Sequence, residues 1–240
     1  MRQFSAPHLA ALAVLIVATV AAVATARRRP GAPTDWLARA LAALILAAWA
    51  GEYVADAVNG TWSVKYTLPL QLTDVISLSA AAALLTRRRL FVELVFLWSL
   101  TATLQATLTP DLGQYFPSIY YFTYFTYHIG AIVAGCMLVF GCRMYPRPGA
   151  VWRVWGLTLV WAAIAGAGDL ITGGNYMYMR TKPQHNSLLS LMGTWPWYIA
   201  ETVVLGLAML LAVQWLTDQV ARHDPARELG HDDRARAIGG

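Results

Sequence analysis

The sequence predicts an all-α polytopic membrane protein, a bundle of seven transmembrane helices with the N-terminus outside and the C-terminus in the cytoplasm. Of the 240 residues, 58% are hydrophobic and 13% are charged, whereas soluble proteins carry charge at about a quarter of their positions. The apolar residues are gathered in blocks of about 20, the length that a helix needs to cross a membrane. Arginines cluster in alternate connections between these blocks. Together, these observations predict both the helix count and the orientation.

The seven expected spans follow one another with short connections. They cover Pro7–Ala26, Leu37–Val58, Pro69–Leu85, Phe91–Leu108, Ile119–Phe140, Trp152–Ile171 and Pro196–Leu216. Within lipid, every backbone N–H and C=O must be satisfied inside the segment, so blocks of this length are expected to be helices. Residues 1–218 therefore form one transmembrane domain, and the charged residues 219–240 are expected to be a disordered cytoplasmic tail.

The orientation rests on where the arginines lie. Runs at Arg27–Arg29 and Arg87–Arg89, and further arginines at 143, 147 and 153, fall in alternate connections. Arginine-rich loops stay in the cytoplasm, so these connections and the C-terminal tail are predicted to be cytoplasmic. An alternative is a secretory signal cleaved after Ala24-Thr25-Ala26. Cleavage would leave Arg27–Arg29 outside, against the other loops, so an uncleaved first helix is favoured.

Charge and cysteines exclude other classes. The net charge of +5 comes from arginines at the ends of apolar blocks, which is a topology signal and does not indicate nucleic-acid binding. Cys136 and Cys142 are too few to build a zinc site. We therefore expect membrane lipids as partners, no nucleic acid, no cofactor and no metal. The sequence does not determine the oligomeric state.

Polar side chains gather toward the outer ends of several predicted spans. A charge inside a membrane is costly unless it faces a bundle interior or water, so each one is a candidate for function. Glu52 and Asp56 are four residues apart and share a helix face. The remaining candidates at this level are Gln71, Thr73, Asp74, Gln105, Asp169, Asn175, Tyr176 and Glu201. The inner halves of the spans are rich in Ala, Leu and Val, which predicts a polar cavity open toward the outside.

The fifth span adds tyrosines and then His128, near the middle of the membrane at 1.5 Å per residue. A threonine hydroxyl is a weak nucleophile that needs a base, and a neutral histidine oriented by a carboxylate can serve. Thr73, His128 and Asp74 are therefore the predicted catalytic set. A structural role is the alternative for each polar residue, since such groups also bond to neighbouring helices and to interfacial water.

Several strings resemble the YwaF-type bacterial integral membrane family. They are Leu68-Pro69-Leu70-Gln71-Leu72, the run from Leu104 to Asp111, His128-Ile129-Gly130, Gly174-Asn175-Tyr176-Met177-Tyr178, Lys182-Pro183 and Trp195-Pro196-Trp197-Tyr198. This family is distantly similar to the transmembrane protein 164 group, implicated in moving acyl chains between phospholipids. It is more remotely similar to androgen-induced-type lipid hydrolases, which use Thr and His.

The resemblance implies acyltransferase or lipid hydrolase activity in a bacterial plasma membrane. Many bacterial members have His-Leu-Cys where this chain has Gln71-Leu72-Thr73. A cysteine nucleophile is therefore not carried over; either Thr73 replaces it or this branch has lost the activity. The alternative functions are a transporter or receptor-like binding protein for an ion, proton or small polar solute, and a structural or assembly factor. For binding, the expected residues are the carboxylates Glu52, Asp56, Asp169 and Glu201.

Overall fold

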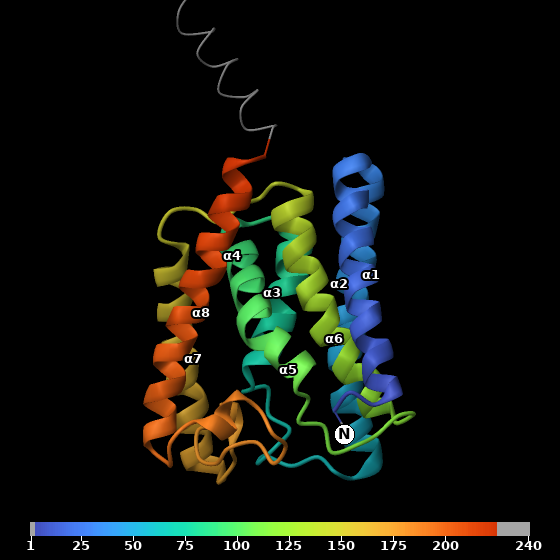
Figure 1. The fold of residues 1–240 in the computed structure, drawn as a ribbon. Helices are drawn as coiled ribbons and strands as arrows, with labels where there is room; N and C mark the ends of the chain where they lie inside the picture. The colour runs from blue at the N-terminus through green and yellow to red at the C-terminus, as the bar shows by residue number, and fades with distance from the viewer. Residues whose placement is uncertain (1–2, 225–240) are drawn as a thin grey trace, which may run out of the picture.

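The computed structural model describes residues 3–224, and these residues are helical without any strand. The long helices run up and down side by side (Figure 1). They are α1 (Ala6–Arg28), α2 (Ala32–Asn59), α3 (Leu72–Thr86), α4 (Arg89–Trp98), α5 (Leu104–Leu108), α6 (Ile119–Cys136), α7 (Ala150–Thr172) and α8 (Trp197–Arg222). Two π-helical segments extend these helices without a break. Segment η1 (Ser99–Thr103) joins α4 to α5, and η2 (Met137–Gly141) follows the end of α6. The 3₁₀ turns η3 (Tyr176–Tyr178) and η4 (Leu188–Leu191) lie in the loop before α8.

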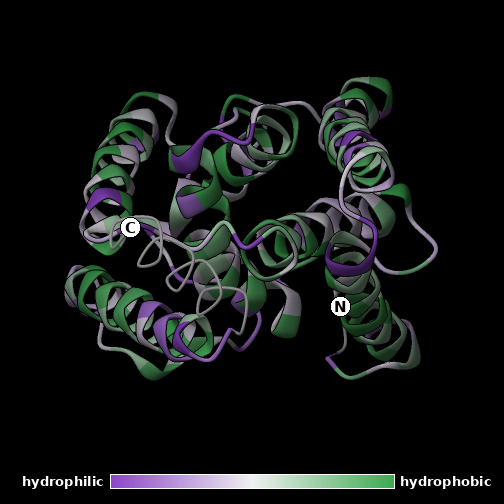
Figure 2. Cartoon of the chain, turned by 90° about the horizontal axis from the view of Figure 1, so that it is seen from above, coloured by the Kyte–Doolittle hydropathy of each residue, from purple (hydrophilic) through white to green (hydrophobic). Residues whose placement is uncertain are grey.

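Six helical segments are long and apolar enough to cross a membrane, which confirms a multi-pass membrane protein. They are Ala6–Arg28, Ala32–Asn59, Arg89–Leu108, Ile119–Gly141, Ala150–Thr172 and Trp197–Arg222. Each coincides with one of the predicted spans to within six residues at either end. Hydrophobic residues predominate along these helices when the bundle is viewed from above (Figure 2). Such a surface is expected for helices that face lipid.

The predicted third span is also an apolar helix, but a short one. Helix α3 has 15 residues, which gives about 22 Å against a hydrocarbon core of ~30 Å. It begins at Leu72 rather than at Pro69, because Leu68 and Leu70 form a tight turn and the Asp74 carboxylate accepts a hydrogen bond from the Gln71 backbone N–H at 2.8 Å. That contact caps the first turn of α3. The start of this helix is therefore recessed from the end of the bundle.

Two other boundaries differ from the predictions. Helix α2 begins at Ala32, with Pro33 in its first turn, where the missing proline N–H costs no hydrogen bond. Helix α8 continues to Arg222, past the predicted domain boundary at residue 218. Most of the predicted tail, residues 225–240, lies outside the described residues.

The core of the bundle is formed by α2, α3, α4 and α6, and α6 is the most enclosed of these helices. Glycines allow the backbones to approach closely. A Cβ on Gly130 would lie 2.6 Å from the Ile45 side chain of α2, and a Cβ on Gly135 would lie 3.0 Å from the Phe96 backbone of α4. Small residues at helix crossings are typical of membrane bundles. These contacts fix the depth of α6 relative to α2.

One end of the bundle is held by ion pairs to a buried carboxylate. The Glu93 side chain is 1% exposed and accepts hydrogen bonds from Arg147 Nε at 2.8 Å and Arg153 Nη2 at 3.0 Å. The Arg147 backbone N–H also donates to it, at 3.1 Å. Glu93 therefore ties the start of α4 to the loop before α7 and to α7 itself.

Replacing Glu93 with alanine is expected to lower the free energy of unfolding by about 2 to 4 kcal/mol, because two arginines lose their buried partner. Asp35→Ala is the control: Asp35 is 59% exposed and pairs with Arg87 at 3.3 Å, so its removal is expected to cost less than about 1 kcal/mol. Chemical unfolding of the purified variants in detergent measures both values. Equal effects of the two changes would contradict a structural role for burial of Glu93.

Candidate functional site

The register between α2 and α3 sets the depth of the candidate site. The Arg87–Asp35 pair joins the two helices at the arginine-rich end. About 20 Å further along each helix, the Trp49 indole N–H and the Tyr53 hydroxyl donate to Asp74 Oδ1 at 2.9 and 2.7 Å. From that level, α2 continues to Asn59, a further ~15 Å. The N-terminus of α3 thus lies inside the bundle.

Helix α6 brings His128 to the same level. Gly130 packs on Ile45, and Tyr127 and Thr123 lie against the Glu52 carboxyl group. His128 is therefore opposite the part of α2 that lies between Ile45 and Glu52, which is the part that holds Asp74. Because α3 and α6 also pack against each other, the N-terminus of α3 and the His128 ring occupy one layer of the bundle.

The surroundings of His128 favour one tautomer. Its side chain is 3% exposed and lies between the Tyr124 and Tyr127 rings, at centroid distances of 4.0 and 4.7 Å. Its Nδ1 is 2.8 Å from the Tyr124 carbonyl oxygen. A carbonyl only accepts hydrogen bonds, so Nδ1 carries the proton and Nε2 of the neutral ring is an acceptor. No described residue hydrogen-bonds to Nε2, so its lone pair is available.

Thr73 is the second residue of α3. It lies on the helix face of Ser77, Ala80 and Leu84, which are all at most 2% exposed. The Thr73 side chain is half-buried, and its hydroxyl hydrogen-bonds to no described residue, His128 included. Backbone N–H groups in the first turn of a helix have no partner within the helix, and the helix dipole places positive charge there. The hydroxyl therefore lies beside donors suited to an anion.

Asp74 has a structural role that differs from the predicted one. Its Oδ1 accepts from Trp49 and Tyr53, and its Oδ2 accepts from the Gln71 backbone. It makes no hydrogen bond to His128. The expectation that Asp74 orients His128 is therefore corrected: the Tyr124 carbonyl holds the imidazole, and Asp74 fixes the start of α3.

Glu52 adds an acidic group to this layer. Its Oε2 is buried, and no described residue donates a hydrogen bond to that atom. It interacts electrostatically with the Asp74 and Asp56 carboxyl groups. A buried carboxyl oxygen without a partner is costly, so an atom of this kind is a candidate for proton or ligand binding.

Most of the other predicted site residues hold the loops at the end of the helices opposite the arginine-rich end. Asp56 accepts from the Thr61, Tyr120 and Thr67 hydroxyls, which closes the end of α2. Asp169 is 1% exposed and accepts from the Tyr176 backbone N–H at 2.7 Å, although its Oδ2 has no partner among the described residues. The remaining contacts are Asn175 with Thr181 and Arg180, and Glu201 with the Gly193 backbone.

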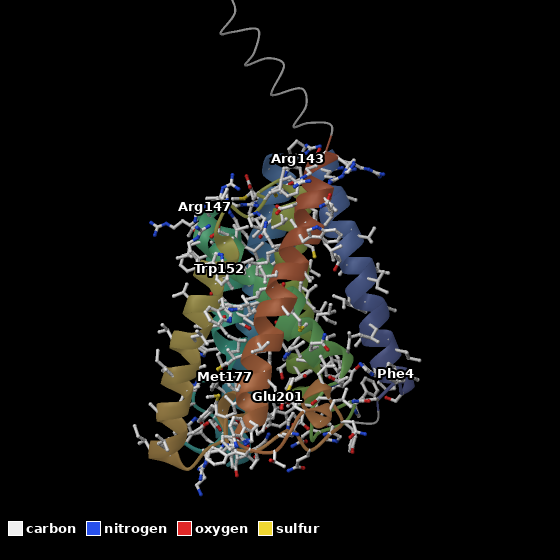
Figure 3. All side chains as sticks on the ribbon, turned by 60° about the vertical axis from the view of Figure 1, so that its left-hand side comes forward. Phe4, Arg143, Arg147, Trp152, Met177 and Glu201 are labelled. Atoms are coloured by element: carbon white, nitrogen blue, oxygen red, sulfur yellow. The ribbon has the colours of Figure 1, made fainter. Side chains whose placement is uncertain are left out.

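The loop before α8 reaches the N-terminus of α3. The Met177 backbone N–H donates to Gln71 Oε1 at 2.9 Å. The Tyr176 hydroxyl donates to the Val64 carbonyl at 2.7 Å and accepts from the Leu68 N–H at 2.9 Å. Burial raises the pKa of the Tyr176 phenol, which keeps this donor protonated. Met177 and Glu201 thus lie at the end opposite Arg143 and Arg147 (Figure 3).

Asp111 forms a second anchor for this loop. It accepts from the Tyr178 hydroxyl at 3.0 Å, and its other oxygen is 2.6 Å from His185 Nδ1. Burial raises the pKa of the Tyr178 phenol as well. The side chain of Gln105, another predicted site residue, makes no hydrogen bond to a described residue. Most residues expected to line the outer cavity therefore hydrogen-bond to loops in this structure.

Two residues of this layer were missed by the sequence prediction. Trp49 and Tyr53 hold Asp74, yet in the sequence they resemble lipid-facing aromatics. Their spacing could have indicated this role. Glu52 and Tyr53 follow Trp49 by three and four residues, so both lie on the same side of the helix as Trp49. Within residues 3–224, no group of three or more His, Cys, Asp and Glu side chains is arranged to hold a metal ion.

Replacing Asp74 with alanine is expected to lower the free energy of unfolding by about 2 to 4 kcal/mol, because the cap of α3 is lost and two half-buried donors lose their acceptor. Asp74→Asn is the matched variant, since its amide oxygen still accepts from Trp49 and Tyr53, and a smaller loss is expected. Unfolding followed by tryptophan fluorescence measures both. An alanine variant as stable as the wild type would contradict this role.

Comparison with known families gives one result. The family model of the TMEM164 family matches residues 3–213, from the start of α1 into α8. This match confirms the predicted likeness to the transmembrane protein 164 group, while placement in a YwaF-type branch stays a prediction. Comparisons with curated proteins and with solved structures give no match. Because the family model covers most of the chain, the protein belongs to the TMEM164 family.

Proposed function

We propose that this protein is a lipid-active enzyme, an acyltransferase or hydrolase, in which Thr73 is the nucleophile and His128 is the general base. The observation that carries the proposal is the state of His128. Its Nδ1–H is bound by the Tyr124 carbonyl, which leaves Nε2 as a hydrogen-bond acceptor, and its helix α6 packs against α3. A neutral histidine in this tautomer can accept a proton from a hydroxyl.

The proposed reaction has two steps. In the first, Thr73 Oγ1 attacks the carbonyl carbon of a lipid ester while its proton passes to His128 Nε2. The ester C–O bond then breaks, and the leaving alkoxide takes that proton from the imidazolium. In the second step, water or the hydroxyl of another lipid attacks the acyl-threonine, and His128 again accepts the incoming proton and returns it to Thr73. Water gives hydrolysis, and a lipid hydroxyl gives acyl transfer.

The N-terminus of α3 supports the anionic intermediate. The Asp74 N–H donates to the Gln71 carbonyl at 3.1 Å, whereas the Leu72 and Thr73 N–H groups donate to no described residue. These two groups are suited to bind the oxyanion, together with the positive end of the helix dipole. Gln71 and Asn175, which were also predicted to bind substrate, are engaged with the loop before α8. Their proposed role is to hold that loop over the end of α3. In unliganded sites, catalytic hydrogen bonds are often long and shorten when substrate binds.

The proposal includes a topology. We infer seven spans in a bacterial plasma membrane, with α3 as the short third span and the 60–71 loop completing its path. The N-terminus is placed outside and the arginine-rich end in the cytoplasm, because arginine-rich connections are retained there. The catalytic layer then lies in the outer half of the membrane. An acyl chain can reach it laterally from the lipid without crossing water.

Wild-type protein in nanodiscs containing isotope-labelled phospholipid is expected to exchange or release acyl chains, as measured by mass spectrometry. Thr73→Ala and His128→Gln are each expected to lower this rate by about 100-fold or more. Thr73→Ser retains the hydroxyl and is expected to keep substantial activity. Ser79→Ala removes another buried hydroxyl of α3 and serves as the control. Unchanged turnover in His128→Gln would contradict the mechanism.

A second candidate, transport or binding of a proton or cation, is favoured by one observation, the unpartnered Glu52 Oε2. This function predicts proton or cation flux in proteoliposomes that is lost in Glu52→Gln. The enzyme proposal predicts instead that Glu52→Gln retains acyl turnover. Proteoliposome flux assays with a pH-sensitive dye distinguish the two. Flux lost in Glu52→Gln together with no acyl turnover by the wild type would favour the transporter.

A further inference from the structure

The arginine-rich end of the bundle contains a pocket far from the proposed catalytic layer. The pocket has a volume of about 420 Å³ and is lined by the side chains of Arg89, Arg143, Tyr145, Arg147 and Asp224. It therefore lies where the connections of α3 to α4 and of η2 to α7 meet the end of α8. Arg143 and Arg147 lie at this end of the helices in Figure 3.

The arginines around this pocket are held in place by carboxylates that are themselves buried. Arg147 is bound by Glu93, which is 1% exposed, and Arg143 Nε donates to Asp224 Oδ2 at 3.0 Å. The Tyr145 hydroxyl donates to the same Asp224 oxygen at 2.8 Å. Arg89 donates to the Tyr145 carbonyl at 3.2 Å. Because these side chains are already ordered, little of their conformational entropy remains to be lost on binding.

The arginines retain many hydrogen-bond donors. A guanidinium has five N–H donors. Arg143 uses Nε for Asp224, and Arg89 uses Nη1 for a carbonyl, and neither donates elsewhere to a described residue. The side chains of Arg143 and Arg147 remain 46% and 49% exposed. Their remaining N–H groups can therefore reach a ligand in the pocket.

The local charge is positive. Four arginines, Arg89, Arg143, Arg147 and Arg153, surround two carboxylates, Glu93 and Asp224. Counting one charge for each group leaves an excess of two positive charges among these residues. A planar guanidinium group can donate two parallel hydrogen bonds to two oxygens of one phosphate or carboxylate. An anion with several oxygens is thus the ligand class that this pocket suits.

The level of the pocket indicates where that anion comes from. Trp152, at the start of α7, is 59% exposed and lies close to Arg147, on the side away from that end of the bundle (Figure 3). Exposed tryptophans are enriched at the membrane–water interface, at the level of the lipid headgroups. Basic pockets between helices at this level bind phosphate-bearing headgroups. We propose that Arg89, Arg143 and Arg147 form a binding site for the phosphate of an anionic lipid headgroup.

This proposal is independent of the enzyme proposal, because the pocket shares no residue with the layer around His128. Native mass spectrometry of the purified wild type, titrated with phosphatidylglycerol or with phosphatidylcholine, measures it. Tighter binding of phosphatidylglycerol is expected. Arg89→Gln combined with Arg143→Gln is expected to weaken that binding by about tenfold or more. Both substitutions spare Arg147 and therefore leave the ion pairs of Glu93 intact.

Arg28→Gln is the matched control, since Arg28 is an exposed arginine at the same end and does not line the pocket. It is expected to retain the wild-type affinity. Inorganic phosphate is the second probe: displacement of the lipid by phosphate supports a phosphate site, and binding of phosphate without lipid would assign the site to the free anion. Equal affinity of the wild type for the two lipids, with no binding of phosphate, would overturn the proposal even if the variants fail to fold. The proposal would also be overturned if Arg28→Gln weakened phosphatidylglycerol binding as much as the double variant does.

Discussion

The hydrogen bonds of the Asp74 carboxylate are the constraint on which the layer around His128 depends. They join the start of α3 to Trp49 and Tyr53 of α2, and they cap the first turn of α3 through the Gln71 backbone. The helix therefore begins well inside the bundle, where its free N–H groups and the Thr73 hydroxyl meet the level of His128. A longer third helix that started at the outer surface would move these groups away from that level.

The two ends of the bundle use polar residues in different ways. At the end of the bundle near Met177, carboxylates and tyrosine hydroxyls bind the backbone of loops, as Asp169 does with Tyr176 and the Tyr176 hydroxyl does with Val64. At the arginine-rich end, buried Glu93 holds Arg147 and Arg153. Backbone groups near the hydrocarbon need partners, which explains why so many polar residues at the first of these ends bind the loops.

Hydropathy alone predicted six of the helices closely, because a membrane demands long apolar segments. The sequence prediction placed the start of α3 three residues too early, because it did not use the local cap between Gln71 and Asp74. The depth of that start could not be predicted, since it depends on the contacts of Asp74 with Trp49 and Tyr53 of another helix. The same holds for the site. Sequence placed Thr73 and Asp74 near the outer end of their span and His128 near the middle of the membrane, so their relative depth is known only from the packing of α3 and α6 on α2. The loop partners of Asp56, Asn175 and Glu201 are mainly backbone groups or nearby hydroxyls, which carry no sequence signal.

The proposed mechanism requires that a lipid ester acylates Thr73 with His128 as the base. Intact-protein and peptide mass spectrometry can detect this acyl-enzyme after brief incubation in nanodiscs with phospholipid carrying an isotope-labelled acyl chain. One labelled acyl group is expected on the peptide that contains Thr73, and none in His128→Gln. Acyl turnover by the wild type with the label on another residue, or with equal labelling of Thr73 in His128→Gln, would contradict this mechanism.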